Sequence, residues 1–188
     1  MTSLTHKIQY ELLHCATKIT RSVQKSVHME SLSKLTLSLA EELEEQRYQP
    51  EAYTRFAIKD PKLREIYAPS FRDRLAQSWL VYHLNPAVER VLIDDTFANR
   101  IGKGTLAAVA RAQHFMRQPQ HSHYLQLDIQ SFFNSIWLPK LMNLGQEIMH
   151  RYFQNHSYRE VLNALLIQCI THPIAQNTYT VSGDRALL

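Results

Sequence analysis

The sequence predicts an α+β fold, with a mainly helical body, a β-hairpin and a small antiparallel sheet. Three observations lead to this fold class. Over most of the chain, apolar residues recur every three or four positions, which is the period of an amphipathic helix. Before residue 70, two short runs of period two flank an Asp-Pro pair, the pattern of a hairpin. A further apolar run, from Tyr124 to Asp128, predicts a strand in the sheet.

The composition is that of a soluble globular protein of one domain, or of one domain and a part. The chain has 188 residues, of which 45% are hydrophobic and 20% are charged, so it can bury a core and is not of the disordered class. It has no apolar run of membrane-spanning length, and we expect no membrane partner. Cys15 and Cys169 are far apart in the sequence, which favours a reduced, cytoplasmic setting.

Positive charge is concentrated in the middle of the chain. Residues 47–117 hold 12 basic and 7 acidic side chains, an excess of +5, whereas the whole chain has a net charge of +4. Such a segment is typical of proteins with a polyanionic partner, because Lys and Arg contacts to phosphates release counterions. The alternative is that these side chains form a basic surface that contacts solvent and no polyanionic partner.

Two amphipathic helices are predicted in the first fifty residues, over 5–28 and from Ser31 to Arg47. The second helix has an acidic run that lies mostly on the face opposite its leucines. We expect this run to be a solvated surface without chemistry; its members are Glu41, Glu42, Glu44 and Glu45.

A β-hairpin with a cationic tip follows. Its strands are predicted over Thr54–Ile58 and Leu63–Tyr67, with the Asp-Pro turn between them. Lys59, Lys62 and Arg64 lie at or beside the tip, where clustered cations can hold a triphosphate. On their own, three cations near a turn are more often solubilising than functional.

A third helix is predicted to begin at Ser70, which forms a capping-box pattern with Asp73. Asp73 and Arg74 are interpreted as anchors of this helix and not as catalytic groups. Asn85-Pro86 is expected to end the helix, with the proline in the first turn of a short successor through Val91.

Two glycines flank Lys103 just before an alanine-rich helix predicted over Leu106–Arg117, with Thr105 as its N-cap. Glycine lets the backbone approach a phosphate closely, and a helix N-terminus favours anions. The spacing is not that of a Walker A loop.

The apolar run from Tyr124 places the carboxylate of Asp128 at the end of a strand, followed by the adjacent aromatics Phe132 and Phe133. Such a carboxylate suits Mg²⁺, which takes oxygen ligands from one or two carboxylates and from substrate phosphates. The alternative is that Asp128 caps the next helical turn and both phenylalanines lie in the core. Two more helices are predicted, over 138–150 and 158–170.

The segment Leu127–Ile136 resembles motif A of reverse transcriptases. Upstream, Arg55 to Ile66 is similar to the fingers hairpin of the bacterial enzymes, and Phe97 to Thr105 to their next motif, with Phe97 in place of the usual tyrosine. The motifs occur in the family's order over roughly 30–170. The resemblance is greatest to retron and group II intron-like enzymes, and among these to the polymerases of diversity-generating retroelements.

The resemblance implies a role for each candidate residue. Asp128 and the backbone carbonyl of Ile129 would bind the two catalytic Mg²⁺ ions, and Phe133 would favour deoxynucleotides by excluding a 2′-hydroxyl. Arg64 and either Lys59 or Lys62 would contact the phosphates of the incoming nucleotide; the sequence does not decide between the two lysines. Finally, Arg100 and Lys103 would face the template or nucleotide side of the fingers.

The resemblance therefore implies an RNA-directed DNA polymerase with an RNA template, a DNA or RNA primer and deoxynucleotides as partners. It divides the chain into a helical extension (1–50), fingers (51–122) and a partial palm (123–188). The family's downstream Asp-Asp turn is missing after Asp128. We therefore expect an N-terminal fragment that is inactive alone. An accessory protein is not indicated by the sequence.

Two other function classes are open. One is a non-catalytic nucleic-acid-binding or phage-defence module that is derived from a reverse transcriptase. The other is a plain helical interaction domain, which leaves the basic hairpin and the glycine-flanked lysine unexplained.

Overall fold

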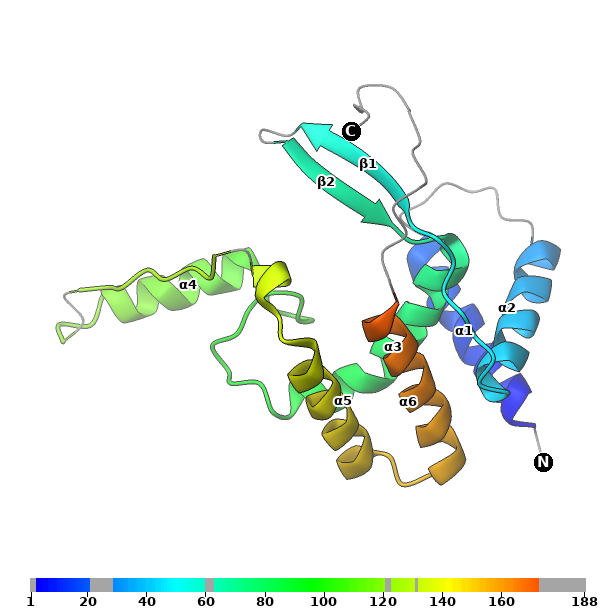
Figure 1. Ribbon diagram of the computed structural model, residues 1–188. Helices are drawn as coiled ribbons and strands as arrows, with labels where there is room; N and C mark the ends of the chain where they lie inside the picture. Colours follow the sequence, from blue (N-terminus) through cyan, green and yellow to red (C-terminus); the bar gives the residue numbers. More distant parts are fainter. Residues whose placement is uncertain (1–2, 21–28, 60–62, 121–122, 131, 173–188) are drawn as a thin grey trace. The chain divides into compact units, whose positions relative to one another are not determined.

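The structure is a computed structural model that describes residues 3–20, 29–59, 63–120, 123–130 and 132–172. It confirms an α+β, mostly helical chain (Figure 1). The elements of these residues are α1 (Leu4–Thr20), α2 (Met29–Glu44), β1 (Thr54–Lys59), β2 (Leu63–Ala68), α3 (Phe71–Glu89), α4 (Thr105–Met116), the 3₁₀ helix η1 (Phe132–Ser135), α5 (Leu138–Tyr152) and α6 (His156–Thr171).

The chain divides into two compact units. The first unit comprises Met1–Asn85 and Leu138–Leu188, and the second comprises Pro86–Trp137. The first unit therefore contains α1, α2, the hairpin, most of α3, α5 and α6, and the second contains α4 and η1. The division into a helical extension, fingers and a partial palm has other boundaries than these two units. It stays a prediction.

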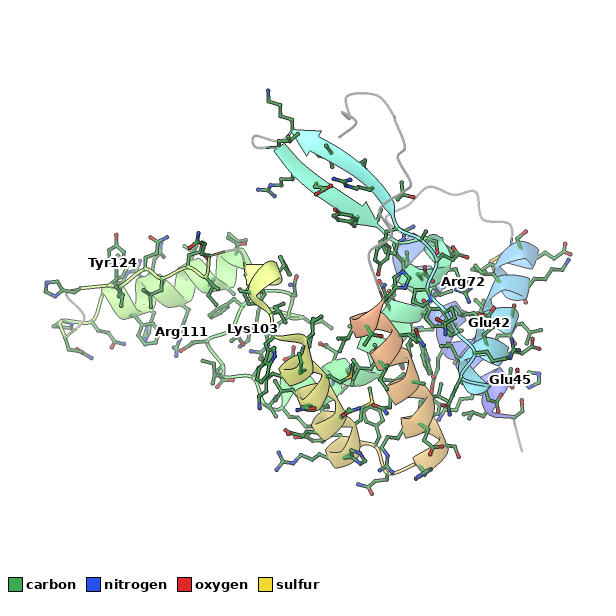
Figure 2. All side chains as sticks on the ribbon, viewed as in Figure 1. Glu42, Glu45, Arg72, Lys103, Arg111 and Tyr124 are labelled. Carbon is green, nitrogen blue, oxygen red and sulfur yellow. The ribbon has the colours of Figure 1, made fainter. Side chains whose placement is uncertain are left out.

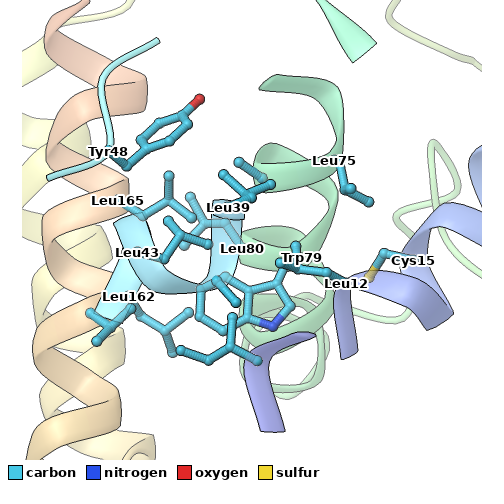
Figure 3. Close-up of a cluster of buried hydrophobic side chains, with 14 of the residues drawn as sticks. Leu12, Cys15, Leu39, Leu43, Tyr48, Leu75, Trp79, Leu80, Leu162 and Leu165 are labelled. Carbon is cyan, nitrogen blue, oxygen red and sulfur yellow. The ribbon is translucent and has the colours of Figure 1, made fainter. Parts of the chain in front are cut away.

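The first unit has a hydrophobic core to which α1, α2, α3, α5 and α6 contribute (Figure 3). Leu12 of α1, Leu39 of α2, Trp79 of α3 and Leu162 of α6 are each 0% exposed. In α1, Ile8, Leu12 and Cys15 follow one another at spacings of four and three, so they share a face that packs into the core. Helical periodicity in the sequence therefore indicated the face of α1 that packs into the core.

One buried carboxylate connects α3 to the segment before the hairpin. Asp73, 0% exposed, accepts hydrogen bonds from the Tyr48 hydroxyl at 2.7 Å and from the Glu51 amide at 2.8 Å. The Ser70 hydroxyl accepts a hydrogen bond from the Asp73 amide at 3.2 Å. Ser70 is therefore the N-cap of α3, as expected. Asp73 thus anchors α3, in agreement with its interpretation as a structural residue.

The acidic run of α2 is not the purely solvated surface that we expected. Glu42 forms an ion pair with Arg72 of α3 (Figure 2), and Glu44 accepts a hydrogen bond from the Thr5 hydroxyl of α1. Both carboxylates are only partly exposed. The expectation failed because helical spacing within α2 does not show that α1 and α3 pack beside it.

A second carboxylate joins three helices. Oε2 of Glu11 accepts hydrogen bonds from Trp79 Nε1 at 2.9 Å and from the Tyr158 hydroxyl, and it lies 2.9 Å from His83 Nε2. Burial opposes the charge on Glu11, but these hydrogen bonds outweigh it and hold the pKa of the carboxyl below its ordinary value. Burial lowers the pKa of His83, so the imidazole is neutral near pH 7.

The predicted helix break at Asn85-Pro86 is wrong. Helix α3 continues through Pro86 to Glu89. A proline inside a helix loses one backbone hydrogen bond and costs about 3 kcal/mol. Packing offsets this cost, because Leu84 lies against the core and Ala87 is buried.

The strand predicted to end at Asp128 is also absent from the described residues, in which β1 and β2 form the only sheet. The side chains of Leu125 and Leu127 are 80% and 81% exposed. A strand needs a hydrogen-bonded neighbour, and none of the described segments pairs with this one.

No described helix combines the length and the apolar character needed to cross a membrane.

Candidate nucleotide and nucleic-acid site

The hairpin presents the two described cations of its tip, Lys59 and Arg64, on opposite faces. Lys59 pairs with Leu63, and Arg64 pairs with Ile58, in an antiparallel register. Paired residues share a face and successive residues alternate, so Lys59 and Arg64 point to opposite sides. Both side chains are exposed. Lys62 lies outside the described residues.

A third cation stabilises the hairpin. Arg55 forms an ion pair with Glu65 across the two strands, and its guanidinium lies 5.8 Å from the ring centroid of Tyr67. Arg55, Glu65 and Tyr67 belong to the face that carries Lys59. That face therefore contains an internal ion pair, whereas the Arg64 face also carries Phe56 and Ile66.

In the second unit, Arg100 contacts its own loop. Its Nε donates to Glu89 Oε2 at 2.9 Å, and its Nη2 lies 2.8 Å from the same oxygen in an ion pair. Its Nη1 donates to the Ile93 carbonyl at 2.9 Å and to the Thr96 carbonyl at 3.1 Å. The Arg100 side chain is only 10% exposed. The structure thus gives Arg100 an internal role that its sequence motif did not indicate.

Lys103 lies in the same loop and is half-buried. Its ammonium donates to the Asp94 carbonyl and lies 5.3 Å from the ring centroid of Phe97. An ammonium group has three donors, so this single bond is compatible with a phosphate contact. The ring face of Phe97 supports the lysine.

The glycines beside Lys103 have a conformational role. Gly102 has φ +75° and Gly104 has φ +114°, values that glycine adopts readily. Gly104, and not Thr105 as predicted, is the N-cap of α4. An extended serine or threonine cap is favoured at most helix starts, but here the chain enters α4 in a conformation that only glycine accommodates without strain.

A surface ion pair that sequence reasoning missed joins α4 to the loop. Arg111 donates to both carboxylate oxygens of Asp95, at 2.7 and 3.3 Å, and stacks 4.4 Å from the ring centroid of Phe115. The hydrogen bond from Arg111 lowers the pKa of Asp95. Arg111 and Lys103 are labelled in Figure 2. The partners are too distant in sequence for helical spacing to indicate the pair.

Asp128 lies at the surface of the second unit. Its Oδ1 accepts the amide hydrogen of Ile129 at 3.0 Å. Phe133 is 84% exposed and Phe132 is 49% exposed, with their rings edge to face and 5.3 Å between centroids. The alternative in which both phenylalanines fill a core is therefore wrong.

Asp128 can supply one of the carboxylate ligands that Mg²⁺ uses. In the part of the chain that the structure describes, no three His, Cys, Asp or Glu side chains come together as a metal site. A two-metal centre needs further ligands beside Asp128.

No protein-family model matches the chain, and no curated protein matches it either. What can be said of its function therefore depends on the motifs and on the geometry described above.

Proposed function

We propose that the chain carries the fingers and part of the palm of an RNA-directed DNA polymerase. The observation that carries the proposal is the segment from Asp128 to Phe133, in which the carboxylate and the second phenylalanine ring are both exposed to solvent. The basic hairpin and the glycine-flanked Lys103 precede it in the order of the reverse-transcriptase motifs.

In this proposal Asp128 and the Ile129 carbonyl hold Mg²⁺, and Phe133 lies beneath the sugar of the incoming deoxynucleotide. Arg64 and either Lys59 or Lys62 contact the phosphates of the nucleotide. Lys103 contacts the phosphates of an RNA template or of its primer, in the cytoplasm.

Nucleotidyl transfer by two metal ions needs more carboxylates than Asp128 supplies. The 188 residues contain no Asp-Asp pair after Asp128, and in the earlier pair, Asp94-Asp95, the second residue is bound by Arg111. We propose that these 188 residues bind nucleic acid but do not extend a primer by themselves.

The test is binding of the 188-residue chain to a fluorescein-labelled RNA–DNA duplex, followed by anisotropy at several salt concentrations. Affinity is expected to fall with salt, with a slope of about −0.9 per phosphate contact. Lys103→Ala should weaken binding and reduce the slope by about 1. Lys34→Ala is the matched control, because Lys34 is exposed and pairs with Glu30 on the acidic helix α2. Absent or salt-insensitive binding would favour a plain interaction domain.

A second candidate function is a non-catalytic nucleic-acid-binding or phage-defence module. It is favoured by the lack of an Asp-Asp pair after Asp128 in these 188 residues. Primer extension by the complete open reading frame, with Mg²⁺ and deoxynucleotides, separates the two candidates. Extension that Asp128→Ala abolishes supports the polymerase, and duplex binding without extension supports the module.

A further inference from the structure

Among the described side chains of the second unit, Arg100 makes the most hydrogen bonds. Its Nε donates to Glu89 at the end of α3, where Nη2 also lies in ion-pair contact, and its Nη1 donates to the carbonyls of Ile93 and Thr96 and lies 2.5 Å from the Thr96 hydroxyl oxygen. Glu89 is 32% exposed and Arg100 only 10%. One guanidinium therefore connects the end of a helix with the turn that follows it.

The loop that carries Lys103 is held mainly by polar contacts. The loop has three residues with positive φ, namely Asn99 at +57°, Gly102 and Gly104, and no described side chain between residues 88 and 104 is fully buried. Apolar packing therefore contributes little to its conformation. The acceptor of Arg100, the Ile93 carbonyl, is adjacent to the acceptor of Lys103, the Asp94 carbonyl.

We propose that Glu89 and Arg100 are positioning residues, which fold the loop 93–103 so that Lys103 can reach a nucleic-acid phosphate. The binding part of this inference rests on the proposed function. Arg100 itself makes no phosphate contact, because its donors would first have to leave Glu89 and the two carbonyls. This replaces the direct role that the motif suggests for Arg100.

The two roles predict opposite effects of Glu89→Gln on binding to the RNA–DNA duplex. If Arg100 contacted phosphate, the loss of a competing carboxylate would leave the affinity unchanged or raise it. If Glu89 and Arg100 position the loop, affinity falls by about three- to fivefold although a negative charge has been removed. Glu41→Gln, on the exposed face of α2, measures the effect of removing a charge alone.

Two further variants test the mechanism. Arg100→Lys keeps the charge, but a lysine cannot bond to Glu89 and two carbonyls at once. This variant should therefore bind the duplex more weakly than the native chain. Glu89→Gln should have little added effect in the Lys103→Ala background, since both changes act through the same lysine. Full affinity of Arg100→Lys, or additive losses in the double variant, would overturn the proposal.

Hydrogen exchange of the amides in 93–103 gives a readout that needs no nucleic acid. Glu89→Gln and Arg100→Gln should both accelerate exchange in this loop, whereas Lys103→Ala should change it much less, because Lys103 makes a single hydrogen bond there. Unchanged exchange in Glu89→Gln overturns the positioning role. Accelerated exchange in a chain that does not bind the duplex leaves the positioning of the loop supported and shows that the proposed function is wrong.

Discussion

At the scale of single residues, one carboxylate connects three helices: Oε2 of Glu11 in α1 accepts hydrogen bonds from Trp79 of α3 and from Tyr158 of α6. Hydrogen bonds to an ionised group are roughly twice as strong as neutral ones. Removing the carboxylate would leave the indole N–H of Trp79 and the Tyr158 hydroxyl without this partner in a buried site. Glu11 therefore stabilises the packing of α1 against α3 and α6.

Glu11→Ala is expected to lower the free energy of unfolding by about 2–4 kcal/mol, because buried donors lose a charged acceptor. Urea denaturation followed by circular dichroism measures the loss. Glu30→Ala provides the comparison: its ion pair with Lys34 is exposed, so the change should stay within about 0.5 kcal/mol. Equal losses in the two variants would contradict the role of Glu11.

The pH dependence of stability follows from the same cluster. The folded-state pKa of both Glu11 and His83 is below the ordinary value, so the unfolded chain takes up protons more readily than the folded one. Their contribution is complete above the ordinary pKa values, 6.5 for histidine and 4.5 for glutamate, and is lost as the pH falls. We expect stability to decline below pH 6.5.

Urea midpoints measured from pH 8 to pH 4 test this decline. Other histidines also titrate in this range, so the informative quantity is the difference between the native chain and His83→Gln. That difference should shrink as the pH falls from 6.5 to 5. A difference that is constant with pH would show that His83 is not held neutral by burial.

At the scale of elements, the start of α4 depends on Gly104. Its φ of +114° is strained for any residue with a Cβ, although open space surrounds the position. Gly104→Ala should destabilise the start of α4 by about 1–2 kcal/mol, measured as faster hydrogen exchange in its first turns. Thr105→Ala is the control, since Thr105 is exposed and is not the cap. It should leave exchange nearly unchanged.

The elements also show what the sequence could predict. Helices α2, α5 and α6 and the hairpin were predicted nearly at their observed positions, because periodicity and turn residues are local signals. The helix predicted over 5–28 agrees with α1 as far as Thr20, and its remainder, 21–28, lies outside the described residues. The strand predicted to end at Asp128 is wrong, because the pairing of strands depends on segments that are distant in the sequence. Pro86 was misinterpreted because a local rule for proline was overridden by packing on both sides of it.

The candidate site was predictable to a smaller extent. The exposed positions of Asp128, Phe133, Lys59 and Arg64 agree with surface roles, which themselves stay predictions. The internal bonds of Arg100 could not be foreseen, because they depend on the path of the loop between residues 89 and 100. A basic residue in a motif does not show whether its partner is a ligand or the protein itself.

At the scale of the whole molecule, apolar burial is uneven. The core cluster draws on α1, α2, α3, α5 and α6, whereas none of the described side chains from 88 to 137 is fully buried. In the second unit, Ile101 and Leu106 are 95% and 88% exposed. The stability of the two units therefore has different sources, hydrophobic burial in the first and polar contacts in the second.

Leu162→Ala and Leu106→Ala test this difference. Leu162 is 0% exposed in the core, and its truncation should cost about 2–5 kcal/mol of unfolding free energy. The same change at Leu106 should stay within about 0.5 kcal/mol. Both values come from urea denaturation monitored at α-helical wavelengths. A large loss of unfolding free energy in Leu106→Ala would mean that the Leu106 side chain is covered in solution.

The chain has two tryptophans, and each unit contains one of them. Trp79 is 0% exposed in the first unit, and Trp137 is 71% exposed in the second. The two indoles therefore emit from an apolar and an aqueous environment, and quenching by iodide reaches only one of them. Replacing Trp137 with phenylalanine leaves a fluorophore that reports on the helical core alone. Replacing Trp79 leaves one that reports when a ligand covers the segment after Phe133.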